Sequence, residues 1–216
     1  WASQVYPNPF ILLVMYWTKY LFIFIGGWAF FVSLSSDYPG FMSFGGWVFT
    51  AVAFQKAILW AVVYESIGLG CSFGPMNGRY SPLTGGFLHF LRPGTTKLPL
   101  FPGIPVFGGI RRTWLDVLLY GANLFFLVRA LVAPEVTPAL LLPSFILLPV
   151  LAIVDKTLFL AARGEHYYVV LVCLTVASGD ALWISSCKVV WCAVWFWAAT
   201  SKAKFALVIG SASWST

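Results

Sequence analysis

FILLVMYWTKYLFIFIGGWAFFVSL, residues 10–34, contains one charged side chain, Lys19, in an otherwise uncharged and largely apolar run. A helix that crosses a bilayer needs about 20 consecutive predominantly apolar residues, so this run is long enough to cross one. The whole 216-residue chain is 60% hydrophobic, 19% aromatic and 9% charged, whereas a soluble domain carries about 25% charged residues. The composition therefore predicts an integral membrane protein.

Five more apolar segments follow the first, which makes about six predicted transmembrane helices. They cover residues 10–34, 47–69, 114–132, 139–154, 167–183 and 188–200. The fourth is short and is interrupted by Pro143 and Pro149, and proline inside a helix removes a backbone hydrogen bond and kinks the chain. The predicted fold class is an all-α polytopic membrane protein, with residues 1–216 forming a single transmembrane domain. Because the chain begins at Trp1 and not at Met, we expect it to be a fragment of a longer protein.

The net charge and the numbers of cysteines and histidines limit which partners and metal sites the sequence predicts. The net charge of +6 does not indicate nucleic-acid binding here, because basic residues in a membrane protein mainly set its orientation and contact anionic lipid. The four cysteines form no CxxC pair, and the two histidines are too few for a multi-histidine iron site and form no HExxH pair. The sequence predicts no metal site.

Basic residues are concentrated in the connection between the second and third predicted helices. Residues 70–113 contain no acid and five basic residues: Arg79, Arg92, Lys97, Arg111 and Arg112. The connection between the first two helices contains Asp37 and no basic residue. Because Lys and Arg are enriched in short cytoplasmic loops, this pattern predicts that residues 70–113, the link 155–165 and both chain ends lie on the cytoplasmic side.

The same connection is rich in Gly and Pro, and Pro99, Pro102 and Pro105 favour an extended backbone. Such a backbone cannot face lipid, so we expect an interfacial loop whose apolar residues pack against helix ends. Its donors suit a phosphate or carboxylate headgroup, and the candidate ligands are Arg92, Thr95, Thr96, Lys97, Arg111 and Arg112. The alternative is that these residues only orient the protein and anchor it at the membrane surface.

A second polar region, residues 155–168, contains the candidates Asp155, Lys156, Arg163, Glu165 and His166. The predicted topology places His89 on the same side as His166, so the two histidines are candidates to meet. A histidine beside carboxylates suits proton transfer or axial ligation of a haem or chlorin. The sequence requires no cofactor, and the alternative is an interfacial histidine with a structural hydrogen bond.

Among the charged side chains inside predicted transmembrane helices, Lys19, Lys56 and Glu65 stand out. A charge near the bilayer centre costs from about 2.5 kcal/mol upward, so it usually faces a partner or a cavity. We expect Glu65 to pair with one of the lysines from a neighbouring helix. The alternative is a path for a substrate or a proton.

Three strings carry a family resemblance: YESIGLGCSFGPMNGRYSPLTGGFLHFLRPGTTKLPLFPG, GGIRRTWLDVLLY and DKTLFLAARGEHYY. They resemble, in the same order, an uncharacterised family of bacterial multi-pass inner-membrane proteins, known as a domain of unknown function. The similarity covers residues 1–202 and implies an integral protein of the bacterial inner membrane. Family members continue after WFWAATSK with a pattern similar to a segment of the membrane part of vitamin-K-dependent carboxylase-like proteins. Here the chain continues with SKAKFALVIGSASWST, so the lysine of that segment is not carried over to Lys202.

These observations support three functional hypotheses. The favoured one is a non-catalytic subunit or scaffold that contacts lipid, pigment or partner subunits of a larger membrane complex. The second is a carboxylase-like membrane enzyme or lipid-handling protein with a cytoplasmic-side polar site made of Arg92, Lys97, Arg111, Arg112, Glu165 and His166. The third is a haem- or chlorin-binding subunit that uses His89 or His166. The sequence leaves open whether the protein is an enzyme.

Overall fold

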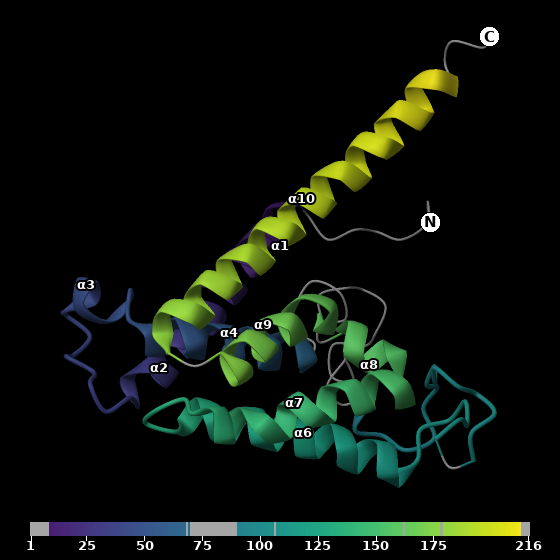
Figure 1. Cartoon of the computed structure of the whole chain (residues 1–216), viewed down its shortest axis with the longest axis horizontal. Coiled ribbons are helices and arrows are strands. Elements are labelled where there is room, and N and C mark those ends of the chain that lie inside the picture. The colour runs from purple at the N-terminus through teal and green to yellow at the C-terminus, as the bar shows by residue number, and fades with distance from the viewer. Residues whose placement is uncertain are drawn as a thin grey trace.

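The computed structural model describes residues 9–67, 69, 90–105, 107–161, 163–177 and 179–212, and the elements it shows there are helical (Figure 1). In chain order they are α1 Pro9–Thr18, the π-helix η1 Lys19–Ile25, α2 Gly26–Ser33, α3 Phe44–Trp47, α4 Ala51–Ser66, α6 Trp114–Val132, α7 Pro138–Val154, α8 Lys156–Ala161, α9 Gly164–Val176 and α10 Asp180–Ala212. An all-α fold is therefore confirmed for the described part of the chain. Two of its helices, Trp114–Val132 and Asp180–Ser201 within α10, are long and apolar enough to cross a membrane.

The first predicted helix, residues 10–34, is confirmed as one continuous helix built from α1, η1 and α2. Its middle section is a π-helix that begins at Lys19 and ends in helical geometry at Gly26. Gly27 lets α4 approach closely, since a Cβ atom there would lie 2.7 Å from a ring carbon of Trp60. The Trp60 Nε1–H donates to the carbonyl oxygen of Phe24 at 2.9 Å, so α4 is tied to this first helix.

The second predicted helix, residues 47–69, is shorter in the structure. Thr50 has an extended backbone and its hydroxyl accepts a hydrogen bond from the Ala53 N–H at 3.2 Å, so α4 starts only at Ala51. Such a side-chain cap satisfies a backbone donor that has no partner within the helix. From Ile58 to Tyr64 every side chain of α4 is buried, and α4 forms part of the main apolar core with residues of α6, α7, α9 and α10.

The third and fourth predicted helices are confirmed as α6 and α7. Thr113 and Asp116 form a reciprocal capping box that starts α6, as expected for a Thr three residues before an acidic side chain. Pro138 occupies the first turn of α7, where a missing N–H costs nothing. Pro143 and Pro149 lie inside α7, which is one continuous helix of 17 residues.

The predicted boundary between the fifth and sixth helices is wrong. The helix α9 ends at Val176, because Ala177 is extended and Gly179 adopts a φ of +86°. The next helix, α10, then begins at Asp180, whose carboxylate accepts from the Trp183 Nε1–H at 2.9 Å. Trp183 therefore belongs to α10, which spans 33 residues and is far longer than the predicted segment. The short helix α8 was also not predicted.

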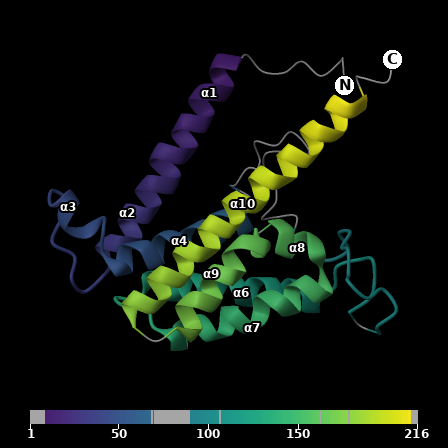
Figure 2. The same cartoon turned by 45° about the horizontal axis from the view of Figure 1, so that its top comes forward.

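The helices form a bundle from which two helices project. In Figure 1, α6 and α7 lie side by side below α4 and α9, and Figure 2 shows α1 and α10 rising separately from this bundle. One end of the bundle gathers the connections that follow α2, α6 and α9. The opposite end gathers the described part of the basic loop, the start of α6, the end of α7 and α8.

Candidate functional site

Four charged side chains form a closed cluster, here called the loop clamp, where the basic loop meets α6 and α7. Lys97 Nζ lies 2.8 Å from Asp116 Oδ1, and Arg112 is paired with Asp155. All four side chains are at most 1% exposed. Burying a charge is costly unless an opposite charge and hydrogen bonds compensate it, and here each base has its own carboxylate.

Asp116 has two tasks because it lies in the first turn of α6. Its Oδ2 accepts from the Thr113 N–H at 2.6 Å and from Lys97 Nζ at 2.9 Å. A carboxylate at this position also interacts favourably with the positive end of the helix dipole. The capping residue of α6 is thus the anchor for Lys97 of the loop.

Asp155 is the corresponding anchor at the C-terminal end of α7. Its Oδ1 accepts from the Leu98 N–H at 3.2 Å and from the Thr157 N–H at 3.1 Å, while its Oδ2 accepts from Arg112. The Arg112 guanidinium also lies 5.0 Å from the centre of the Phe90 ring, a distance at which a cation is attracted to an aromatic face. One carboxylate therefore joins the loop to α7 and α8.

The backbone of the loop reinforces the clamp. Thr96 and Arg111 form an antiparallel bridge, in which the Lys97 N–H donates to the carbonyl oxygen of Ile110 at 2.9 Å. The Leu100 N–H also donates to the carbonyl oxygen of Ile153 at 2.9 Å. The backbone of the loop is therefore fixed to the helix ends through hydrogen bonds as well as through charges.

The apolar side chains of the loop are only partly covered. Leu98, Leu100, Phe101, Ile104 and Phe107 are between 37% and 54% exposed, although the backbone of the loop is fixed to the helix ends. The reason is that Lys97, Pro99 and Arg112 occupy buried positions of this segment. The loop consequently presents an apolar outer surface.

The six candidate headgroup ligands of the loop fall into two groups. Lys97 and Arg112 are buried in the loop clamp. Thr95 lies beside them, where its hydroxyl accepts from Arg112 and donates to the carbonyl oxygen of Arg92. The other three, Arg92, Thr96 and Arg111, are exposed. Lys97 and Arg112 thus face fixed carboxylates of the protein, and among the described residues of the loop Arg92 and Arg111 carry the exposed guanidinium groups.

A second group, here called the mixed-charge cluster, comprises Lys19, Glu65, Arg163, Glu165 and His166. It joins the start of η1, the last turn of α4 and the start of α9. The charges of Arg163, Lys19 and Glu165 all act electrostatically on the Glu65 carboxyl. The His166 Nδ1 lies 3.4 Å from Glu165 Oε1, and these two side chains are 37% and 38% exposed. In contrast to the loop clamp, this cluster contains two partly exposed side chains, Glu165 and His166.

Glu65 has an unusual carboxylate. Its Oε2 is buried and accepts no hydrogen bond within the described part of the chain. Leaving a buried charged acceptor without a donor costs more than about 1–3 kcal/mol, the range for neutral groups, and native structures contain few such atoms. Of the two lysines inside the predicted helices, Lys56 is on the same helix as Glu65 and its Nζ donates to the carbonyl oxygen of Phe31 at 2.7 Å. Lys19 comes from the neighbouring first helix, and its charge acts on the Glu65 carboxyl.

The backbone of this cluster is irregular at two positions. Arg163 adopts φ +52° and ψ +38°, and it is the one residue other than glycine with a positive φ among those described. Its carbonyl oxygen accepts from the N–H groups of His166 and Tyr167, both at 3.0 Å. The buried Lys19 opens the π-helical section of the first helix. Both features are more frequent at functional sites than elsewhere.

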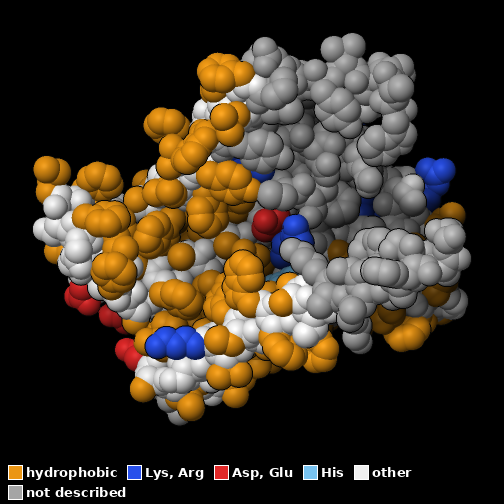
Figure 3. Space-filling view, turned by 90° about the horizontal axis from the view of Figure 1, so that it is seen from above, with side chains coloured by type: hydrophobic (Ala, Val, Ile, Leu, Met, Phe, Trp, Pro, Cys, Tyr) orange, Lys and Arg blue, Asp and Glu red, His pale blue; other side chains and the backbone are white. Residues whose placement is uncertain are grey.

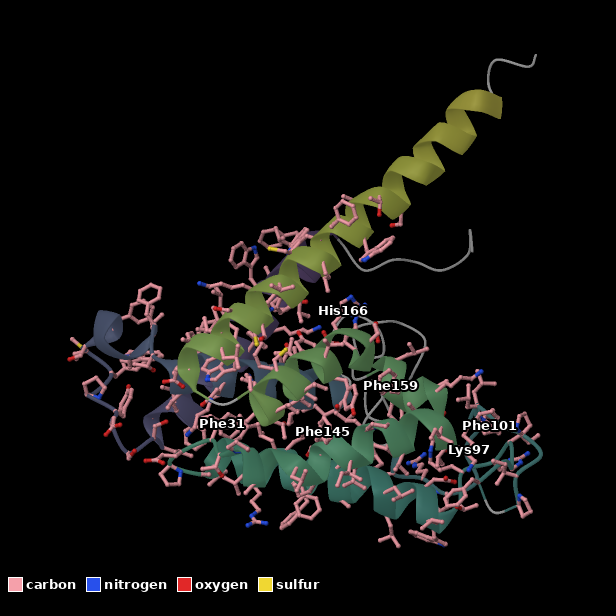
Figure 4. The ribbon with its side chains drawn as sticks, viewed as in Figure 1. Phe31, Lys97, Phe101, Phe145, Phe159 and His166 are labelled. Carbon is pink, nitrogen blue, oxygen red and sulfur yellow. The ribbon has the colours of Figure 1, made fainter. Side chains whose placement is uncertain are left out.

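The structure therefore divides the predicted polar region 155–168 between two places. Asp155 belongs to the loop clamp, and Lys156 follows it as the first residue of α8. Arg163, Glu165 and His166 belong to the mixed-charge cluster, and Figure 4 shows His166 at the start of α9, separated from Lys97 beside α6. His89 lies outside the described residues. Within those residues, no group of three or more His, Cys, Asp or Glu side chains could hold a metal ion.

One comparison with known proteins identifies a family. The family model described as "Transmembrane protein of unknown function (DUF3556)" matches residues 1–213. No curated protein and no solved structure matches the chain. The match extends from the N-terminal helix to the end of α10 and so includes both the loop clamp and the mixed-charge cluster.

Proposed function

Because this chain belongs to the DUF3556 family of transmembrane proteins, we propose that it is a six-pass membrane protein serving as a non-catalytic subunit or scaffold. Its outer faces would contact lipid and partner subunits of a larger membrane complex. In the proposed arrangement the first helix, α4, α6, α7, α9 and α10 each cross the bilayer. The membrane is the bacterial inner membrane, in line with the family resemblance of the sequence.

The observation that carries this proposal is the large apolar surface of α10. Only 11% of the apolar window within Asp180–Ser201 is buried inside the protein. Trp195, Phe196 and Trp197 are between 63% and 74% exposed, and Figure 3 shows apolar side chains over much of the face seen from above. Contiguous apolar surface of this kind marks contact with a membrane or another protein.

The distribution of charge supports the proposed topology. The acidic residues Asp37, Glu135 and Asp180 lie in or beside the connections at one end of the bundle, and Figure 3 shows acidic groups along its left-hand edge. The exposed bases Arg92 and Arg111 lie at the opposite end. Because basic residues favour the cytoplasmic side, we assign the end with the loop clamp to the cytoplasm.

The loop clamp supports a scaffold rather than a reaction centre at the basic loop. Its four charged groups neutralise one another in pairs, and they hold the loop against α6 and α7. The loop then presents Leu100, Phe101 and Ile104 outward, close to Arg92 and Arg111 in sequence. Apolar and basic side chains together suit contact with the headgroup region of the membrane.

Photo-crosslinking in the native membrane tests the scaffold proposal. A photoreactive amino acid at Trp195 of α10 should crosslink to one defined protein, whereas the same amino acid at the exposed Val128 of α6 should crosslink mainly to lipid. Native mass spectrometry of the particle extracted with its lipids should show the same protein bound. A particle that contains one copy of this chain, lipids and no second protein, with lipid adducts at both positions, would contradict a subunit role.

A second candidate function is that of a lipid-handling protein. The observation that favours it is the mixed-charge cluster, in which Glu65 Oε2 is buried without a hydrogen-bond donor among the described residues. The cluster shares Glu165 and His166 with the polar site expected from the sequence, but it lacks the four basic residues of the loop. Lipid recognition is compatible with a scaffold role, because subunits of membrane complexes also contact lipid.

A further inference from the structure

We propose that the mixed-charge cluster of Lys19, Glu65, Arg163, Glu165 and His166 binds the headgroup of a zwitterionic phospholipid with a primary ammonium group. The carboxylates would accept hydrogen bonds from the ammonium group, and Arg163 would bind the phosphate. This inference rests on the proposed placement of the chain in a membrane, but it does not require a partner subunit.

The composition of the cluster matches a headgroup that carries both signs of charge. Glu65 and Glu165 supply two carboxylates, and Lys19 and Arg163 supply two cations. Figure 3 shows an acidic and a basic group side by side in the middle of the face seen from above. A purely anionic ligand would approach both carboxylates and be repelled by them, whereas a zwitterion places an ammonium group there.

Glu65 supplies the acceptor for the ammonium group. Its Oε2 is buried and accepts no hydrogen bond from any described residue. A charge-assisted hydrogen bond from an ammonium N–H would satisfy that atom. A quaternary ammonium group, which has no N–H, cannot donate to it. The geometry therefore favours a primary over a quaternary ammonium headgroup.

Arg163 supplies the phosphate contact. Its guanidinium has a planar set of donors that matches phosphate oxygens, and the residue is only partly buried. Lys19 is buried, with its Nζ 5.3 Å from the centre of the Tyr20 ring, so it adds positive charge near Glu65 without needing to contact the ligand. Arg163 also keeps a left-handed backbone, which costs an L-residue about 1–2 kcal/mol. Its position is thus set by the surrounding structure.

The surroundings point to a lipid rather than to a free headgroup. Next to Lys19 on η1, the side chains of Leu21 and Phe22 are exposed and would lie along acyl chains. Glu65 is in the last turn of α4 and Arg163 directly precedes α9, so both lie at helix ends, where headgroups are found. The ligand is therefore expected to contact both the charged cluster and the apolar face of the first helix.

The test compares lipids that differ only at the ammonium group. The protein is reconstituted in nanodiscs of phosphatidylcholine with trace phosphatidylethanolamine, and lipid retained after detergent extraction is counted by native mass spectrometry. Wild type should retain phosphatidylethanolamine over phosphatidylcholine by roughly tenfold, the effect of one charged hydrogen bond. Glu65→Gln should abolish this preference, and Arg163→Gln should reduce retention of both lipids. Glu135→Gln, an exposed acid at the other end, should behave as wild type.

Three outcomes would overturn the inference. The first is equal retention of the two lipids by wild type, and the second is an unchanged preference in Glu65→Gln. The third is equal protection against thermal unfolding by free phosphoethanolamine and by the lipid, which would exclude the lipid as the specific ligand. A separate experiment tests whether the chain is a membrane protein at all. If it is not, alkaline carbonate releases the wild-type chain from its membranes, and this extraction uses no nanodisc.

Discussion

The loop clamp and the mixed-charge cluster use the same kinds of residue in opposite ways. In the loop clamp, Lys97 and Arg112 each have a dedicated carboxylate, and all four side chains are at most 1% exposed. In the mixed-charge cluster, Glu165 is 38% exposed and Glu65 has an oxygen without a donor among the described residues. A base that is fully buried with its own carboxylate indicates a structural role, whereas a buried carboxylate oxygen without a donor, next to partly exposed charged side chains, leaves bonding capacity for a ligand.

The largest expected effect is on the loop clamp. Asp155→Ala leaves Arg112 buried without its carboxylate and removes an acceptor from two backbone N–H groups. Breaking one partner of a buried ion pair costs about 3–5 kcal/mol, so the free energy of unfolding in mixed micelles should fall by that amount. Glu135→Ala, at an exposed site, is the control and should change it by no more than about 0.5 kcal/mol. Equal effects of the two substitutions would show that the clamp does not hold the loop.

The second effect concerns the other pair of the clamp. Lys97→Met and Asp116→Asn should each destabilise the protein, because each leaves a buried polar group without its partner. The double variant should be less destabilised than the sum of the single variants by about 0.5–3 kcal/mol. A double-mutant cycle from equilibrium unfolding measures this difference. Simple additivity would mean that the two side chains are close in space but not coupled.

The third predicted effect is a gain in stability, and it concerns the mixed-charge cluster. Arg163→Gly should stabilise the fold by about 1 kcal/mol, because glycine adopts a positive φ without the steric cost of a Cβ atom. Thermal unfolding in phosphatidylcholine nanodiscs, where the proposed ligand is absent, provides the measurement. Phe107→Gly, in an exposed position of the loop, serves as the comparison. A loss of stability in Arg163→Gly would show that this arginine has a structural role like that of Arg112.

The secondary structure was predictable from sequence wherever local signals were strong. The start of α6 follows from Thr113 and Asp116, a capping pair three residues apart, and its end follows from the apolar run. The break between α9 and α10 was missed because Ser178, Gly179 and Asp180 interrupt the apolar run only briefly, so the predicted fifth helix was extended across them. The missing signal was the positive φ of Gly179, which is a property of the turn and not of composition.

The sites were only partly predictable, for a different physical reason. Lys97 and Arg112 stand out in sequence because they are basic, but their carboxylates lie 19 and 43 residues away along the chain. The mixed-charge cluster likewise combines residues from the first helix, α4 and α9. Such pairings are decided by how helices pack, and residue spacing within one segment carries no information about them.

The effect of Glu65→Gln on thermal stability is the smallest one expected. It tests most directly whether the two clusters have different roles. Asp155→Ala and Glu65→Gln are unfolded thermally in phosphatidylcholine nanodiscs and in nanodiscs with added phosphatidylethanolamine. Asp155→Ala should lower the melting temperature equally in both. Glu65→Gln should leave it unchanged in phosphatidylcholine and lose the stabilisation that phosphatidylethanolamine gives to the wild type. If Glu65→Gln instead destabilises the protein as Asp155→Ala does, in both membranes alike, Glu65 is a structural group and the distinction between the two clusters is wrong.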